Sequence, residues 1–354
     1  MVSRMENKEL LVKDSCWMQN IQDTPIVLST RVRLARNLAG ASFPHILGAE
    51  GGKEVEKKIS DTFGETVVSG EQFTYLSLGV LNPLERRILV EKHLISPDLA
   101  NGKEFSGVAL TDSHKVSVMV NEEDHLRIQV LMPGFNLSES LALAKETDEK
   151  MESKLDFAFK EKFGYLTACP TNVGTGLRIS VMIHLPALVM TNQVQQVLGA
   201  LTHIGLAVRG LYGEGSRALG NVFQISNQVT LGKSEEDTLA YLETMTGQIA
   251  ERESQARQDL WKEVGVMLQD KVWRARGTLE HARLLSGDEV IGLLSEDRMG
   301  VEMGILPKVQ AGFASLLVNS SYGCLQYRID RPLDGNYADF ERANYIRGVY
   351  HTKD

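Results

Sequence analysis

Apolar residues at every second position predict β-strands along the first two thirds of the chain. The pattern holds in five segments, 26–33, 116–120, 127–130, 178–185 and 206–209. In each of them one face of the strand is apolar and the other carries polar side chains. These segments predict a mixed α+β domain built around a sheet.

Helices are expected over 83–94, 138–162 and 191–204. The stretch between Arg178 and Arg209 contains no Asp, Glu, Lys or Arg. It does contain Pro186 and several amides, which argue against a membrane span. A strand followed by an amphipathic helix fits this stretch better.

Helix-start signals mark the last third of the chain. Ser234-Glu-Glu-Asp237 has the order of a capping box and predicts a long helix through about residue 264. Ser286-Gly-Asp-Glu289 predicts a second helix and Pro307 starts a third. A last helix is expected over 336–348.

This change of pattern predicts two domains. A mixed α+β domain is expected over 20–258 and a small all-helical domain over 259–354, with the boundary inside the long helix. The length of 354 residues agrees with this division, at roughly 150 residues per domain.

Composition and charge narrow the classes of function. With 43% hydrophobic and 24% charged residues, the chain has the composition of a globular protein. Its net charge of −8 argues against general binding to nucleic acid or to a membrane surface. Any anion site must therefore be a local concentration of arginine.

The cysteines and the N-terminus favour a cytoplasmic protein. Cys16, Cys169 and Cys324 are odd in number and widely spaced, so neither a disulfide framework nor a zinc site can be drawn. The first residues carry charge throughout and lack the apolar run of a signal peptide.

Two glycine motifs are similar to nucleotide-binding loops, but both signals are weak. Residues 227–234 lack the first glycine of a phosphate-binding P-loop, and a loop that ends in a helix cap at Ser234 is favoured. Residues 213–218 match the loose pattern G-x-G-x-x-A without a clear strand-to-helix turn. An interpretation of the chain as a dehydrogenase would depend on this second motif alone.

Arginines recur on the polar faces of the predicted strands, as Arg31, Arg33, Arg127, Arg178 and Arg209. Arg31 and Arg33 are two positions apart, so they project from one face of one strand. If the strands share a sheet, the guanidinium groups converge on one surface, and arginine binds phosphate through paired donors. A solvated face with scattered arginines would give the same alternation, and the pattern alone does not decide between the two.

Acidic residues and a cysteine accompany these arginines. Glu122 and Glu123 occupy the turn before Arg127. Glu214 follows Arg209, and Cys169 precedes Arg178. Taken alone, acids in turns are usually solvated, and a lone cysteine is usually a small buried apolar residue.

Four motifs that contain these residues resemble the guanidino-phosphotransferase (phosphagen kinase) family. They are Ser29-Thr-Arg-Val-Arg33, Asn121-Glu-Glu-Asp-His-Leu-Arg127, Cys169-Pro-Thr-Asn-Val-Gly-Thr175 and Arg209-Gly-Leu-Tyr-Gly-Glu214. They stand in the family's order, and the resemblance covers roughly residues 20 to 255. It implies a catalytic domain with a mainly antiparallel sheet flanked by helices.

Within this family, a catalytic domain that begins at once and ends in a small helical domain resembles the protein-arginine kinases of bacteria. Arginine and creatine kinases carry a separate helical domain ahead of the first motif, which begins at Ser29 here, so that domain is expected to be missing. The resemblance implies transfer of the γ-phosphoryl group of Mg-ATP to arginine residues in proteins.

The resemblance also implies the site residues. The ATP site comprises Ser29, Arg31, Arg33, His93, Arg127, Arg178 and Arg209. Glu122 would support hydrated Mg²⁺. Glu123 and Glu214 would clamp the acceptor guanidinium and take its proton, and Cys169 would tune the electrostatics without acting as a covalent nucleophile. Such a site works by alignment and charge neutralisation.

The small helical domain is implied to mediate dimerisation and regulation. In the family it carries an Arg-Asp-x-x-Arg-Ala motif for a phosphoarginine pocket. Here Ala338 replaces the first arginine, while Asp339 and Arg342 remain. This replacement is expected to weaken a phosphoarginine pocket at Asp339 and Arg342.

The family resemblance implies partners as well. These are arginine-containing protein substrates, a McsA-type activator, a CtsR-type repressor, a ClpC-type protease and a second copy of the chain, in a stress response. Two alternatives stay open, a kinase for a small free guanidino compound and a nucleotide-dependent adaptor without catalytic activity.

Overall fold

The computed structural model describes residues 9–19, 26–102, 104–210 and 219–352. Within these residues the main sheet contains β1 (Val27–Arg36), β2 (Val67–Val68), β3 (Glu71–Ser77), β4 (Gly107–Thr111), β5 (Val116–Val120), β6 (Leu126–Pro133), β9 (Leu177–His184), β10 (Leu206–Gly210) and β11 (Val222–Asn227). A separate small hairpin contains β7 (Phe159–Lys160) and β8 (Gly164–Tyr165).

The helices are α2 (Ala49–Phe63), α3 (Pro83–Glu91), α4 (Pro97–Ala100), α5 (Leu137–Glu152), α6 (Pro186–Met190), α7 (Val194–His203), α8 (Glu235–His281), α9 (Gly287–Glu302), α10 (Phe313–Asn319), α11 (Tyr322–Ile329) and α12 (Gly335–His351). Short 3₁₀ turns are η1 (Cys16–Met18), η2 (Leu78–Val80), η3 (Pro170–Asn172) and η4 (Leu219–Asn221).

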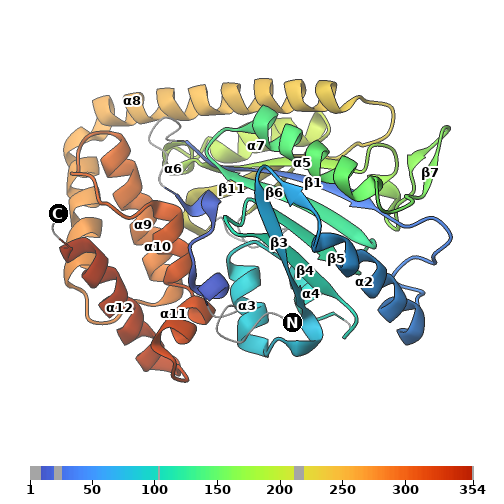
Figure 1. Ribbon diagram of the computed structural model, residues 1–354. Coiled ribbons are helices and arrows are strands. Elements are labelled where there is room, and N and C mark those ends of the chain that lie inside the picture. The colour runs from blue at the N-terminus through green and yellow to red at the C-terminus, as the bar shows by residue number, and fades with distance from the viewer. Residues whose placement is uncertain (1–8, 20–25, 103, 211–218, 353–354) are drawn as a thin grey trace.

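The main sheet is antiparallel at every pair of neighbouring strands. Its order is β10-β11-β9-β1-β6-β5-β4-β3-β2, so β1 lies in the middle between β9 and β6. The expectation of a mainly antiparallel sheet flanked by helices is confirmed (Figure 1).

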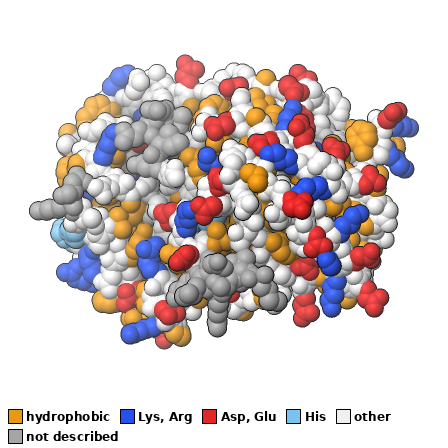
Figure 2. Space-filling view, viewed as in Figure 1, with side chains coloured by type: hydrophobic (Ala, Val, Ile, Leu, Met, Phe, Trp, Pro, Cys, Tyr) orange, Lys and Arg blue, Asp and Glu red, His pale blue; other side chains and the backbone are white. Residues whose placement is uncertain are grey.

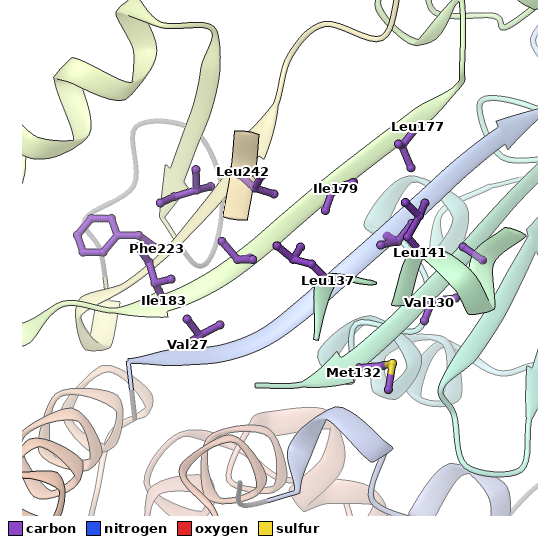
Figure 3. Packing of buried hydrophobic residues seen from close by; sticks show 14 of the residues in the cluster. Val27, Val130, Met132, Leu137, Leu141, Leu177, Ile179, Ile183, Phe223 and Leu242 are labelled. Atoms are coloured by element: carbon purple, nitrogen blue, oxygen red, sulfur yellow. The ribbon is translucent and has the colours of Figure 1, made fainter. Parts of the chain in front are cut away.

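One face of the sheet forms the main hydrophobic core. Val32 of β1 and Ile179 of β9 are fully buried, and they pack in one cluster with Leu141 of α5, Leu198 of α7 and Leu242 of α8. Figure 3 shows part of this cluster between the strands and the helices. Burial at about 25 cal/mol per Å² of apolar surface makes this face the main stabilising contact of the fold.

Two further hydrophobic clusters lie on the other face of the sheet. Leu110 of β4 and Met119 of β5 pack in a second cluster with Leu89 of α3. Val222 of β11 packs in a third cluster with Ile291 of α9. Between the two clusters, β1, β6 and β9 carry polar side chains on this face, among them Arg31, Gln129 and Ser180.

Several predicted strands are confirmed, and two predicted helices differ in extent. The strands expected over 26–33 and 178–185 are β1 and β9. The helix expected over 138–162 ends at Glu152, because the chain that follows turns back and pairs with the residues just after β1. Ala158 N donates to Asn37 O at 2.8 Å, and Ala39 N donates to Asp156 O at 2.8 Å.

The long C-terminal helix extends beyond its predicted end. α8 continues from Glu235 to His281, and Val264, where an end was expected, has non-helical backbone angles inside it. Ser234 caps its start by accepting a hydrogen bond from Asp237 N at 3.0 Å. The loop that ends in a helix cap is thus confirmed for residues 227–234.

The C-terminal helices pack against one side of the molecule (Figure 1). The capping box predicted at Ser286 is confirmed, since Ser286 and Glu289 bond each other's backbone at the start of α9. The helix predicted at Pro307 is wrong. The carbonyl oxygen of Pro307 accepts a hydrogen bond from Arg276 Nη2 at 3.0 Å, and the next helix begins at Phe313. In the described part of the chain, no helix has the length and apolarity that a membrane span needs.

Candidate active site

The predicted arginines lie on one face of the sheet, called the arginine face below. Arg33 of β1 lies directly opposite Arg178 of β9, and Arg31 follows two positions away on β1. Cross-strand partners point to the same side of a sheet. By the same parity, Arg127 on β6 and Arg209 on β10 point to this face. The prediction that these strands share one sheet is confirmed.

The positive charges on the arginine face repel one another. Burial, together with the charges of Arg127, Arg178 and Arg209, lowers the pKa of Arg31 to about 10. Burial also lowers the pKa of Arg178, and neighbouring cations lower it further. Arg31 is still charged at pH 7, so the face carries positive charge that a bound polyanion would neutralise.

Arg33 has a buried donor, its Nε, that no protein group satisfies among the described residues. Burial and the charges of Arg31, Arg127 and Arg178 lower its pKa. Arg31 differs, since its Nη2 donates to Gln224 Oε1 at 2.7 Å. A buried donor without a partner is costly, and it fits a site that holds an anion.

A cleft of about 830 Å³ opens in front of the arginine face. Arg31, Arg33 and Arg127 line one wall, and the opposite wall comes from the C-terminal helices, including Tyr322 of α11. Pockets of roughly 300–1,000 Å³ hold ligands of nucleotide size. On the face of the molecule that Figure 2 shows, acidic and basic side chains are interspersed.

Ser29 and His93 lie at one end of the arginine face. They line a small hollow together with Arg31, Trp17 and Gln224. His93 has a left-handed backbone, with φ of 58°. Burial and the nearby Arg31 lower its pKa to about 4, so the ring is neutral at pH 7. A neutral ring can contact an uncharged group, such as a nucleobase, without a charge penalty.

Trp17 and Gln224 are site residues that no sequence motif indicates. The Trp17 ring meets His93 edge-on, with 5.2 Å between ring centroids. Its Nε1 donates to the Lys92 carbonyl oxygen at 3.0 Å. No pattern links residue 17 to residue 93, whereas the alternation of Val222 to Asn227 would have placed Gln224 on a polar strand face.

The turn before Arg127 brings Glu122 and Glu123 to the edge of the cleft. Arg127 Nη1 donates to Glu122 Oε1 at 2.6 Å, and Nη2 donates to Glu123 Oε2 at 3.3 Å. Ser96 Oγ also donates to Glu122. Burial raises the pKa of Glu123, and Arg127 opposes this effect. A carboxylate with a raised pKa is well placed to accept a proton.

Cys169 lies on a loop that is tied to the acidic turn. Asp124 Oδ1 accepts hydrogen bonds from Ala168 N at 2.7 Å and from Asn37 Nδ2 at 2.6 Å. Cys169 is half-buried. It acts on Arg178 by raising its pKa against the stronger effect of burial, so the thiol lies near the arginine face.

A glycine gives this loop its tight form. Gly174 has a φ of +114°, and a Cβ added there would lie 2.4 Å from the Thr230 carbonyl oxygen. Thr230 Oγ1 donates to the carbonyls of Thr171 and Val173 at 2.9 and 2.7 Å. The glycine of the Cys169–Thr175 motif therefore lets the loop pack against residue 230.

Glu214 lies outside the described residues, as does the glycine motif at 213–218. Its place in the site stays a prediction. Among the described residues, no group of three or more His, Cys, Asp or Glu side chains could hold a metal ion. Glu122 Oε1 accepts hydrogen bonds from Arg127 and Ser96, and its role beside hydrated Mg²⁺ stays a prediction.

Asp339 and Arg342 lie together on α12, but they bind the protein itself. Arg342 donates to Asp339 Oδ1 at 2.6 Å, to Leu285 O at 2.7 Å and to Ser320 O at 3.0 Å. Ala338 beside them is buried. Arg342 lines the cleft, yet these donors already have protein partners. A phosphoarginine pocket at Asp339 and Arg342 stays a prediction.

Comparison with known families agrees with this geometry. The family model described as "ATP:guanido phosphotransferase, C-terminal catalytic domain" matches residues 54–256. The family model described as "Protein-arginine kinase McsB C-terminal domain" matches residues 265–353.

Similar proteins cover nearly the whole chain. The protein-arginine kinase of Geobacillus kaustophilus (strain HTA426) is 45% identical over 336 residues, which are 94% of this chain and 93% of the relative. That of Bacillus subtilis (strain 168) is 44% identical over 342 residues, 96% of this chain and 94% of the relative.

Solved structures share the catalytic part. Lombricine kinase is similar with a TM-score of 0.57 and 25% identity, over 69% of this chain and 70% of that chain. The duplicated taurocyamine kinase from Schistosoma mansoni, with bound transition-state analogue components, has a TM-score of 0.58 and 28% identity, over 69% of this chain and 35% of that chain. The chain therefore belongs to the ATP:guanido phosphotransferase family, on the branch of the protein-arginine kinases.

Proposed function

We propose that the chain is a protein-arginine kinase, which transfers the γ-phosphoryl group of ATP to a guanidino nitrogen of arginine residues in proteins. The observation that carries this proposal is the junction of the arginine face with Glu123. At this junction, arginines that can bind the phosphates of ATP lie next to a carboxylate that can bind the acceptor guanidinium. Similarity to protein-arginine kinases over 94% of the chain supports the choice of acceptor.

We assign the ATP site to the arginine face and to the hollow at its end. Arg31, Arg33, Arg127, Arg178 and Arg209 hold the phosphates, and Ser29 and His93 contact the nucleoside end. When bound, Mg²⁺ neutralises phosphate charge, and Glu122 holds its hydration shell. Phosphoryl transfer passes through a loose transition state, so this alignment and neutralisation supply most of the catalysis.

We assign the acceptor site to Glu123, Glu214 and Cys169. The guanidinium has a pKa above about 12 and a poor lone pair, so carboxylates must orient it and take a proton. Its nitrogen attacks the γ-phosphorus, the bond from that phosphorus to the β–γ bridging oxygen breaks, and ADP leaves with the electron pair. The proton lost from the nitrogen passes to a carboxylate, with Glu123 and Glu214 in this role. Cys169 adjusts the local charge and forms no bond to phosphorus.

The domain division and the role of the C-terminal helices belong to the same proposal. The chain divides near residue 258 into a catalytic domain over 20–258 and a helical domain over 259–354, which forms one wall of the cleft and a homodimer contact. For Asp339 and Arg342 we favour a packing role, because Arg342 bonds two backbone carbonyls and Asp339.

The biological setting rests on the branch of the family. We propose a cytoplasmic enzyme that acts on arginine-containing proteins in a stress response. The partners would be a McsA-type activator, a CtsR-type repressor and a ClpC-type protease.

A kinase for a small free guanidino compound is the second candidate. Lombricine kinase and taurocyamine kinase are similar to this chain in structure. These similarities cover 69% of the chain, whereas the protein-arginine kinase of Geobacillus kaustophilus covers 94%, including the C-terminal helices. An adaptor without catalysis fits less well, because Glu123 and Cys169 both lie near the arginine face.

One experiment separates these functions. The protein is incubated with Mg-ATP and a generic unfolded protein, and the product is analysed by mass spectrometry for phosphorylated arginine. Free arginine is assayed in parallel. A protein-arginine kinase modifies the protein and leaves the free amino acid largely unchanged, and the label is lost in acid because the P–N bond is acid-labile. An acid-stable product would contradict the assignment.

A further inference from the structure

A second cavity lies on the other side of the acidic turn, called the side groove below. It has about 370 Å³, and its lining includes Pro44, Leu47, Asp98, Phe105 and the turn at 121–123. Arg127 lines both this groove and the cleft in front of the arginine face. The two cavities therefore share Arg127, beside Glu123, as a lining residue.

One residue that lines the groove, Asn121, has a buried oxygen without a hydrogen-bond partner among the described residues. Asn121 is 6% exposed, and its Nδ2 donates to Gly52 O at 3.0 Å and to Phe105 O at 2.8 Å. These two bonds fix the orientation of the amide, since only the nitrogen can donate to carbonyls. Asn121 Oδ1 is buried and has no hydrogen-bond partner among the described residues. An orphaned acceptor costs about 1–3 kcal/mol, so it fits a site where a ligand supplies an N–H group.

The rest of the groove has the same chemical preference. Asp98, Glu122 and Glu123 provide carboxylates, and Asp98 is close enough to Glu123 to raise its pKa. Leu47 and Phe105 provide apolar walls. The complementary ligand is a cation that is rich in N–H groups and has an apolar stem, which describes an arginine side chain on a peptide.

We propose that the side groove binds the acceptor segment of the protein substrate, with the aliphatic stem of its arginine on Leu47 and Phe105. Asn121 Oδ1 accepts an N–H group of this segment, and Asp98 attracts basic residues next to the arginine. The segment enters from the groove while ATP occupies the cleft, and the two substrates meet at Arg127. This inference rests on the proposed function and adds the binding of residues that flank the arginine.

The test is a reversal of charge at Asp98, which is exposed and holds no catalytic role. Two peptides are compared, one with lysines next to the acceptor arginine and one with glutamates. The unmodified protein is expected to favour the lysine peptide in kcat/KM by up to about fivefold, since an exposed ion pair contributes up to about 1 kcal/mol. Asp98→Lys is expected to invert this ratio and to leave the KM for ATP unchanged.

The matched control is Glu251→Lys, the same change of charge at an exposed position of α8 on the other side of the sheet. It should keep the ratio of the unmodified protein. Thermal unfolding of both variants shows whether they fold, and a folding defect alone would lower both peptides together without inverting their ratio.

Leu47→Ala tests the contribution of the apolar wall separately from that of Asp98. It should weaken binding of a fluorescent arginine peptide, measured by anisotropy in the absence of ATP, while ADP binding stays unchanged. Equal ratios of kcat/KM for the two peptides in the unmodified protein and in Asp98→Lys would contradict binding of the acceptor segment in the side groove. Unchanged peptide binding in Leu47→Ala would contradict it as well. If the unmodified protein phosphorylates no peptide at all but still binds it in a Leu47-dependent way, the proposed function fails and the groove stands.

Discussion

Arg33 and Arg178 lie directly opposite each other on the neighbouring strands β1 and β9. Like charges at opposite positions of an antiparallel pair destabilise a sheet. Burial lowers the pKa of both guanidinium groups. The charges of other arginines on this face lower both pKa values further. The pair therefore costs folding free energy, and a bound polyanion would offset that cost.

The first prediction concerns Arg178→Ala. Binding of ATP should weaken about ten- to a hundredfold, because hydrogen bonds to a charged group contribute about 1.5–3 kcal/mol. The free energy of unfolding should stay the same or rise slightly, because a repulsive contact with Arg33 is removed. Calorimetric titration and thermal unfolding measure the two effects, with Arg252→Ala on α8 as an exposed control. A marked loss of stability without a loss of ATP affinity would mean that Arg178 is structural.

The second prediction concerns the acceptor carboxylates. Glu123→Gln should nearly abolish phosphorylation while ATP still binds, because the amide keeps the size of the side chain but cannot take a proton or pair with a guanidinium. Glu214→Gln is expected to do the same. Rates are measured by mass spectrometry of phosphoarginine, and ATP affinity by calorimetry. Glu251→Gln is the control, and near-normal turnover in either test variant would remove that residue from the site.

The third prediction is a loss of activity at acid pH. Burial raises the pKa of Glu123 above its usual value. A base works only when it is unprotonated, so the rate should fall as the pH falls through this raised pKa. ADP release is the suitable readout, because the product itself is acid-labile. A rate that stays constant down to the ordinary pKa of a glutamate, about 4.3, would exclude Glu123 as the base.

Alternation in the sequence predicts the central strands because one face of each strand is apolar. β1, β5, β6 and β9 are found in this way. β4 is missed because Gly107 to Thr111 is buried on both faces and shows no alternation. The helix predicted from 138 runs too far because the strand-like contact of Phe157 with Leu38 is made by a distant segment.

Some features of the site can also be predicted from the sequence, and others cannot. The arginine face follows from the parity of Arg31 and Arg33, once the strands are known to be neighbours. The contact of Trp17 with His93 and the orphaned oxygen of Asn121 arise from packing between distant segments. Neither leaves a pattern in the local sequence. Asp339 and Arg342 form an ion pair that the motif alone does not indicate.

The fourth prediction uses Trp17 as a probe of the nucleotide site. Trp17 is 1% exposed and lines the hollow with Ser29 and His93, whereas Trp261 and Trp273 on α8 are 45% and 47% exposed. With both of those replaced by Phe, ADP binding should change the fluorescence of the remaining tryptophan. The same change should be absent in a Trp17→Phe variant that keeps the other two. An unaltered spectrum on saturation with ADP would place the nucleotide elsewhere.

The last prediction concerns the contact between the catalytic sheet and the C-terminal helices. Glu91, at the end of α3, accepts hydrogen bonds from Gly323 N at 2.9 Å and from Cys324 N at 2.8 Å, at the start of α11. Its carboxylate is 14% exposed and also binds Arg87 Nε at 2.9 Å. A negative charge at a helix N-terminus is stabilising, and both of its oxygens are used here.

Glu91→Gln should therefore lower the free energy of unfolding by about 1–3 kcal/mol, because the amide nitrogen would face a backbone N–H that then has no acceptor. Since His93 follows two positions later and lines the nucleotide hollow, the same change should raise the KM for ATP. Glu54→Gln, an exposed position on α2, is the matched control. Thermal unfolding and ATP titration are measured on both variants. If Glu91→Gln unfolds and binds ATP as the control does, α11 is held by its apolar contacts alone, and the carboxylate does not couple the two parts of the chain.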